Sequence, residues 1–157
     1  MSQLSNPETA TGFTHSIKFD YVDLQRTGFL TTIGAANQKQ IGSLPPGGIV
    51  DLVAFYQVTD PAGTSDLTLD VGTTGADPDD FIDNLDVDGL TQVAFNTGDQ
   101  FIGTDSGSGT TSNVLNGVAN NTSSAKPIYM EFNGTVGNLT AGAWVVAWRQ
   151  ADIGQLV

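Results

Sequence analysis

The longest alternating pattern in this chain is VDLVAFYQVTDPAGTSDLTLDVG, residues 50–72. Every second position from residue 50 to residue 58 is apolar, whereas the positions between them are mixed. Because side chains alternate across a strand, this pattern predicts a long strand with one face fully buried and the other partly covered. The face predicted to be fully buried consists of Val50, Leu52, Ala54, Tyr56 and Val58.

A second strand is expected directly after a turn. Residues 60–63, DPAG, supply the turn, because proline presets φ and glycine tolerates a positive φ. Beyond it, Leu67, Leu69 and Val71 alternate with polar residues, which predicts a strand with one buried face. Two strands joined by a short loop predict an antiparallel hairpin.

One short helix is expected near residues 78–85. Asp77 suits the N-cap, and Pro78 suits the first helical position. Phe81 and Leu85 are four residues apart, so both would face the core from one side of a helix.

The rest of the chain adds more strands, which makes it all-β. Glycine-rich turns and a charged content of 14% favour many short strands over a helical bundle. We expect a single β-sandwich or jelly roll of about eight to ten antiparallel strands. Besides the two strands above, one strand is expected to begin at His15. Further strands are expected at residues 28–33, 39–44, 90–95, 114–118, 128–132 and 143–149.

The last of these strands places Trp144 and Trp148 on one face. Aromatic residues in this arrangement either fill the core or form a platform for sugars. Core packing is the interpretation we favour, because the pattern is that of a one-sided strand.

Residues 1–14 show no periodicity and predict an extended amino-terminal arm, followed by one sandwich domain over residues 15–157. The arm is expected either to grip a neighbouring subunit or to pack on its own domain. The candidate contact residues are Leu4, Phe13 and His15.

Charge is distributed unevenly along the chain. Residues 1–48 hold three acidic and three basic residues, whereas residues 49–157 hold 14 acidic and two basic residues and carry the whole net charge of −12. An acidic body without clustered Lys and Arg excludes binding to a phosphate backbone. No apolar run reaches the length of about 20 residues that a membrane helix needs, and the amino terminus lacks the layout of a signal peptide, so synthesis in a cytoplasm is expected.

Residues 84–89, NLDVDG, match the beginning of a calcium-binding loop. The bidentate glutamate of such a loop would fall at residue 95, which is Phe. A calcium site of another form, with Asp83, Asp86 and Asp88 as ligands, stays open beside the alternative of a solvated acidic loop.

Nucleophilic catalysis is poorly supported. Residues 104–107, TDSG, are similar to the nucleophile loop of trypsin-like serine proteases, and His15 is the single histidine. A triad needs a base hydrogen-bonded to the serine and a third residue that orients the base, and the chain is too short for the paired barrels of that family. We expect neither an enzyme nor a bound cofactor.

Three segments carry a resemblance. GSLPPGGIV at residues 42–50 precedes the long strand, DLTLDVG lies at residues 66–72, and ADPDDF lies at residues 76–81. In this order they resemble a widespread group of small virion proteins of tailed bacteriophages, which share an LPAG-like turn, a hydrophobic strand, an L-x-V-G strand end and a DPDAF-like segment. Pro46 stands where alanine is commoner in that group.

This resemblance implies a capsid decoration (cement) protein on the virion surface. Such proteins commonly form homotrimers and tie neighbouring major capsid proteins together, without binding nucleic acid or membrane. The alternatives are a phage fibre, tail or receptor-binding head domain, or a carbohydrate-binding sandwich module.

Overall fold

The computed structural model describes residues 13–33, 36–73, 75, 78–87 and 118–152. Within them the chain forms nine strands, one five-residue α-helix and one 3-10 turn. In chain order the elements are β1 (His15–Asp20), α1 (Tyr21–Gln25), β2 (Thr31–Ile33), β3 (Ala36–Leu44), β4 (Gly48–Ala62), β5 (Thr68–Gly72), β6 (Ile82–Asp86), β7 (Val118–Ala119), β8 (Lys126–Asn133), η2 (Val136–Asn138) and β9 (Ala141–Asp152).

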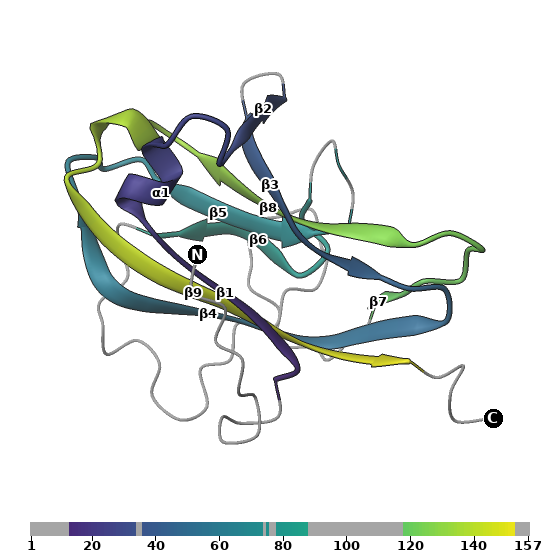
Figure 1. Ribbon diagram of the computed structural model, residues 1–157. Helices are drawn as coiled ribbons and strands as arrows, with labels where there is room; N and C mark the ends of the chain where they lie inside the picture. Colours follow the sequence, from purple (N-terminus) through teal and green to yellow (C-terminus); the bar gives the residue numbers. More distant parts are fainter. Residues whose placement is uncertain (1–12, 34–35, 74, 76–77, 88–117, 153–157) are drawn as a thin grey trace.

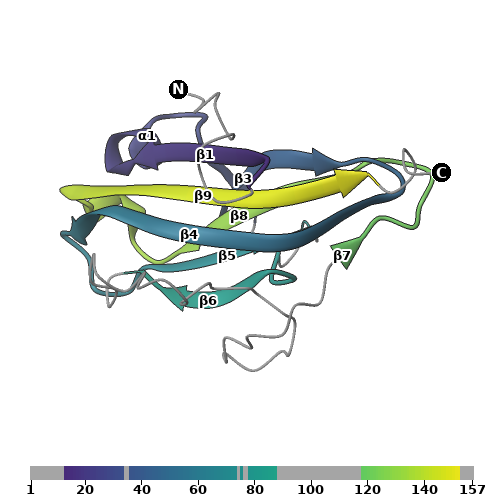
Figure 2. The same ribbon diagram turned by 90° about the horizontal axis from the view of Figure 1, so that it is seen from below.

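The strands form two antiparallel sheets that lie face to face (Figure 1). The four-stranded sheet has the order β1-β9-β4-β7, and the five-stranded sheet has the order β2-β3-β8-β5-β6. Figure 2 shows β1, β9 and β4 side by side in the four-stranded sheet. The predicted all-β sandwich is therefore confirmed.

Strand pairing is nested from the ends of the chain toward its middle. β1 pairs with β9, β3 with β8, β4 with β7, and β5 with β6, all antiparallel. This nested pairing is that of one long antiparallel hairpin that folds over on itself. The folding brings further strands together and adds the pairs β4–β9 and β5–β8. A double sheet with this connectivity is a jelly roll, here with β2 added beside β3.

The predicted hairpin of residues 50–72 is wrong, because its two strands lie in different sheets. β4 lies between β9 and β7, and β5 lies between β8 and β6. Between them the chain crosses from one sheet to the other at Gly63, whose φ is +97°. Thr140 N–H donates to the Ala62 carbonyl at 2.8 Å, which attaches the crossing point to the start of β9. Alternation identifies a strand but says nothing of its partner.

The predicted inner face of β4 is also wrong beyond its first residues. Val50 is buried as expected, but Val53 and Phe55 point inward, and Tyr56 is 48% exposed. The cause is a β-bulge between residues 50 and 52, opposite consecutive residues of β9. One extra residue on a strand turns every later side chain to the other face.

No helix forms in the described part of residues 78–85. Phe81 and Leu85 are buried as predicted, but β6 begins at Ile82. Two residues of β6 oppose a single residue of β5, and Asn84 adopts a positive φ of 49° at this bulge. The bulge lengthens the spacing between buried positions from two residues to three, which resembles a helical period.

A short helix forms instead at the end of β1. Tyr21 begins α1, so β1 ends at Asp20. The Asp20 carboxylate accepts a hydrogen bond from Asp23 N–H at 2.9 Å, and Asp20 N–H donates to the Asp23 carboxylate at 3.3 Å. This reciprocal pair is a capping box, which stabilises a helix start and was not recognised in the sequence.

The core between the sheets is centred on an aromatic cluster. Trp144 lies with its ring centroid 5.7 Å from Phe19 and 5.9 Å from Phe132. Trp148 is buried too, so both tryptophans belong to the core, as we favoured. Gln57 is buried beside them and accepts a hydrogen bond from Trp144 Nε1 at 3.4 Å.

Candidate functional site

A small apolar surface covers the solvent side of the four-stranded sheet. We call it the outer β9 face and define it by Ala143, Val145 and Ala147 of β9 with Ala54 and Tyr56 of β4. Their neighbours along each strand point into the core, and these five side chains are exposed or half-exposed. The short side chains of alanine and valine leave this surface apolar and without a charged group.

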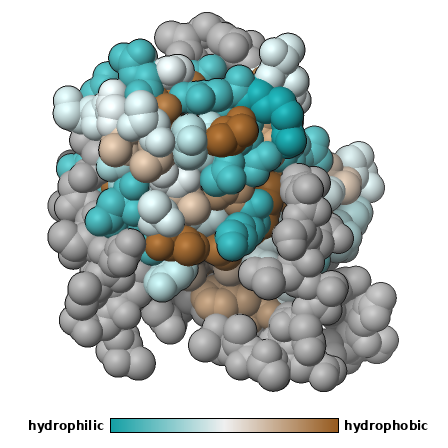
Figure 3. Space-filling model, turned by 60° about the vertical axis from the view of Figure 1, so that its left-hand side comes forward, coloured by the Kyte–Doolittle hydropathy of each residue, from teal (hydrophilic) through white to brown (hydrophobic). Residues whose placement is uncertain are grey.

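The edge strand β1 borders this face with polar residues. Ser16 lies opposite Ala147, Lys18 opposite Val145, and Asp20 opposite Ala143. On the side of the molecule seen in Figure 3, hydrophobic residues lie in separate patches among hydrophilic ones.

The size of the outer β9 face limits what it can bind alone. Two strands at a spacing of about 4.8 Å and five residues along β9 give an area on the order of 150 Å². A stable interface buries about 800 Å² on each partner. The outer β9 face therefore needs a second contact segment to form a lasting interface.

Two of the three predicted contact residues lie at the start of β1, and His15 is paired with the inward-facing Trp148 rather than with the outer β9 face. Phe13 is half-buried, and His15 is exposed, whereas Leu4 lies outside the described residues. The His15 ring stacks on Trp148 with 5.2 Å between centroids and 10° between planes. Thr14 accepts a hydrogen bond from Gln150 N–H at 2.8 Å, which attaches this entry segment to β9.

The contact of His15 with Trp148 makes stability depend on pH. Partial burial lowers the pKa of His15 below its ordinary value of 6.5, because desolvation disfavours the charged ring. The unfolded chain then binds more protons than the folded chain as the pH falls below 6.5. The contribution of neutral His15 to the free energy of unfolding is therefore fully present above that pH. It is lost as the pH falls from 6.5 through the lower pKa of the folded state.

Comparison of His15→Phe with the wild type measures this effect. The variant keeps a ring for stacking on Trp148 but does not titrate. Its free energy of unfolding should decrease less than that of the wild type when the pH is lowered from about 7.5 to about 5. Equal losses in both proteins would show that His15 does not contribute. An NMR titration of the single histidine reports its pKa directly.

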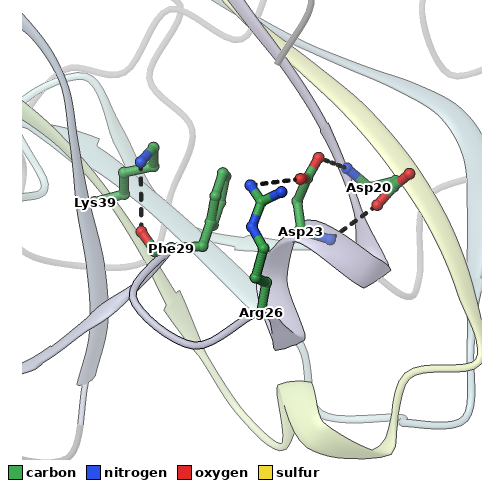
Figure 4. A network of polar contacts seen from close by, with 5 residues as sticks. All are labelled: Asp20, Asp23, Arg26, Phe29 and Lys39. Atoms are coloured by element: carbon green, nitrogen blue, oxygen red, sulfur yellow. Dashed lines mark hydrogen bonds and ion pairs between the residues drawn. The ribbon is translucent and has the colours of Figure 1, made fainter.

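A cation–π cluster fixes α1 to the five-stranded sheet (Figure 4). Lys39 Nζ lies 4.2 Å from the centroid of the Phe29 ring, and Arg26 Cζ lies 5.5 Å from it. Arg26 also forms a salt bridge of 2.9 Å with Asp23. These contacts hold the corner at which β1 continues into β2, so we assign them a structural role.

Two segments of the resemblance form one packing unit. The backbone of residues 78–80 lies against Gly72, where a Cβ would come within 2.6 Å of the Pro78 carbonyl carbon. Asp80 accepts hydrogen bonds from Thr73 N–H at 2.7 Å and from the Thr73 hydroxyl at 2.5 Å. Glycine at the end of β5 is therefore required by the segment that follows it, and both segments contribute to the packing of the fold.

Three polar residues form a buried row on the five-stranded sheet, which we call the polar row: Gln38 of β3, Glu131 of β8 and Asp70 of β5. Gln38 lies opposite Glu131, and Glu131 lies opposite Asp70. Their exposed fractions are 1%, 5% and 3%. Alternation had placed Asp70 on the exposed side of its strand, so its burial corrects that expectation.

Hydrogen bonds satisfy part of this polar row. Gln38 Nε2 donates to Glu131 Oε2. Asp70 accepts from Asn84 N–H at the β6 bulge and from Asn133 Nδ2 at 2.7 Å. Gln38 Oε1 is buried and accepts no hydrogen bond from any residue that the structure describes. A buried carbonyl oxygen without a partner costs about 1–3 kcal/mol.

The calcium candidates are only partly described. Asp83 and Asp86 lie on β6, half-buried and exposed, and Asp88 lies outside the described residues. Asp83 accepts a hydrogen bond from Asn84 Nδ2 at 2.7 Å. Across the part of the chain that the structure describes, no three His, Cys, Asp or Glu side chains gather closely enough to hold a metal ion. The proposed trio itself stays a prediction.

Residues 104–107 lie outside the described part of the chain, so the structure does not place His15 relative to them. No helix among the described residues is long and apolar enough to cross a membrane. The outer β9 face and the polar row were not recognised as sites in the sequence, although the outward residues of β9 already read as small and apolar. Comparisons with protein-family models, curated proteins and solved structures give no significant match.

Proposed function

We propose that this protein is a structural component of a bacteriophage particle, a decoration protein that binds and stabilises the assembled capsid shell. The observation that carries this proposal is the outer β9 face. A surface of Ala143, Val145 and Ala147 beside Tyr56 presents apolar area to a partner but no reactive group. The motif resemblance supplies the identity of that partner, the major capsid protein.

The amino-terminal arm supplies the second contact in this proposal. It leads into β1, and the outward residues of β1 border the outer β9 face. Residues 1–48 carry no net charge, whereas the rest of the chain carries −12. A neutral segment lies against a protein surface without the repulsion that the acidic body would meet, and the body keeps neighbouring copies soluble. Association as homotrimers on the virion surface belongs to the same proposal.

Stabilisation follows from mass action. A subunit that binds the assembled shell but not its dissociated proteins lowers the free energy of the shell by an amount that increases with subunit concentration. Catalysis plays no part in this mechanism.

Reconstitution tests the proposal. Purified protein is added to undecorated shells, and bound copies and the temperature of shell disruption are measured. We expect saturable binding of hundreds of copies and disruption at a higher temperature. Saturating addition without bound protein would refute the proposal. A dozen copies or fewer per native particle would favour a fibre, tail or receptor-binding domain, and binding to a glycan array would favour a carbohydrate-binding module.

A matched pair of variants locates the contact. Ala147→Glu places a carboxylate on the outer β9 face opposite Ala54, and Ala125→Glu adds the same charge at an exposed position between β7 and β8. An unpaired buried charge costs several kcal/mol, so Ala147→Glu should weaken shell binding by more than about tenfold. Ala125→Glu should bind like the wild type. Equal binding by both variants would exclude the outer β9 face as the contact.

A further inference from the structure

We propose that the polar row binds a hard metal cation, with Ca²⁺ as the preferred ion. The oxygens of Gln38 and Glu131 would supply protein ligands, and Asp70 would add a carboxylate from the neighbouring strand. This site is independent of the capsid proposal and distinct from the predicted loop site at Asp83, Asp86 and Asp88.

The first argument is the burial of two carboxylates on adjacent strands. Glu131 and Asp70 lie directly opposite each other and are at least 95% buried. Opposed residues of an antiparallel pair have Cβ atoms about 5 Å apart, so the two carboxyl groups share a small volume. Buried charges in proteins are paired or bind metals. Among the described residues, no Lys, Arg or His forms a salt bridge with Glu131.

The second, independent argument is the unpartnered oxygen of Gln38. The Gln38 amide turns its NH₂ group toward the Glu131 side chain, because Nε2 donates to Glu131 Oε2. The amide oxygen is then left without a donor, although Gln38 is 1% exposed. A cation beside Glu131 would satisfy this oxygen and the carboxylate charge together.

The chemistry of these oxygens selects the class of ion. Carboxylate and amide oxygens are hard ligands, which suit Ca²⁺ and Mg²⁺ rather than a soft transition metal. Ca²⁺ accepts irregular sets of six to eight oxygens at about 2.3–2.6 Å, whereas Mg²⁺ needs near-octahedral geometry. Side chains from three strands meet the looser requirement more easily, and water would complete the shell.

Isothermal titration calorimetry with CaCl₂ on the full chain tests the proposal. We expect saturable binding and a thermal midpoint that rises with calcium and falls again with EDTA. Glu131→Gln keeps the shape of the side chain and should weaken calcium binding at least about tenfold, as should Gln38→Met. The control Gln40→Met changes an exposed glutamine of the same strand and should bind calcium like the wild type.

Terbium luminescence locates the ion without depending on stability. Tyr129 lies two residues before Glu131 on the same face of β8 and would transfer excitation energy to bound Tb³⁺. Tyr129→Phe should lower this emission and leave the calcium affinity unchanged. The double variant Asp83→Asn, Asp86→Asn should keep both signals.

Three outcomes would overturn the proposal. The first is no binding heat and no thermal shift with about 10 mM Ca²⁺ or Mg²⁺, beyond the range of weak natural sites. The second is calcium binding that Asp83→Asn, Asp86→Asn abolishes and Glu131→Gln preserves, which would assign the ion to the β6 loop. The third is a metal-independent wild type that Glu131→Gln stabilises at neutral pH, which would show that the carboxylates share a proton.

Discussion

Replacement of Phe55 by alanine should lower the free energy of unfolding by about 3–5 kcal/mol, the usual cost of removing a buried aromatic ring. Phe55 is fully buried on the inner face of β4, opposite Val146 of β9. The neighbouring change Tyr56→Ala should cost less than about 1 kcal/mol, because Tyr56 is 48% exposed on the outer β9 face. Denaturant unfolding followed by tryptophan fluorescence measures both values.

This pair of variants tests the bulge in β4 directly. Without an extra residue between Val50 and Leu52, simple alternation would place Tyr56 inside and Phe55 outside. A larger loss for Tyr56→Ala than for Phe55→Ala would therefore contradict the bulge. The loss should appear as a lower denaturant midpoint with an unchanged slope, which shows that the denatured state is the same.

Bulges explain most of what the sequence pattern failed to predict about individual side chains. Alternation at β1, β8 and β9 identified the buried faces, because their register with neighbouring strands is regular over the core positions. β4 has three register shifts along its pairing with β9, and β6 has one along its pairing with β5. Each shift adds a residue that the period-two pattern does not reveal. Beyond the shift, the pattern therefore no longer shows which side chains point into the core.

Strand partners were a separate difficulty, because they depend on contacts between distant segments. The turn-like residues 60–63 suggested a hairpin between β4 and β5, but β4 pairs instead with β9, about 90 residues later in the chain. The nested pairing of a jelly roll encloses β5 and β6 at its centre and separates β4 from β5. No turn residue indicates which strands will pair, because the pairing depends on the packing of two complete sheets.

The candidate sites were likewise predictable only in part from the sequence. Small apolar residues on the outward side of β9 were visible as a pattern, and they form the outer β9 face. Burial of the polar row was not predictable, because polar residues at outward positions normally face solvent. Gln38, Glu131 and Asp70 meet only when β3, β8 and β5 are neighbours, which is a property of the sheet order.

Leu69→Ala should cost about 2–5 kcal/mol, the range for buried leucines that leave a cavity. Leu69 is fully buried, and its neighbours in the sheet are Phe132 of β8 and Leu85 of β6. Because β5 is enclosed between two strands, the surrounding backbone has little freedom to collapse, and we expect a loss in the upper half of that range.

Thr68→Ala is the matched control for Leu69→Ala. Thr68 is the preceding residue of the same strand, half-buried on the opposite face, and its change should cost less than about 1 kcal/mol. Urea unfolding of both variants gives the comparison. A loss below about 1 kcal/mol for Leu69→Ala would mean that β5 does not face the core, and the five-stranded sheet would have to be paired differently. A large loss of unfolding free energy for Leu69→Ala but not for Thr68→Ala would support the inward orientation of Leu69 and the enclosed position of β5. The packing of Gly72 against residues 78–80 requires that position.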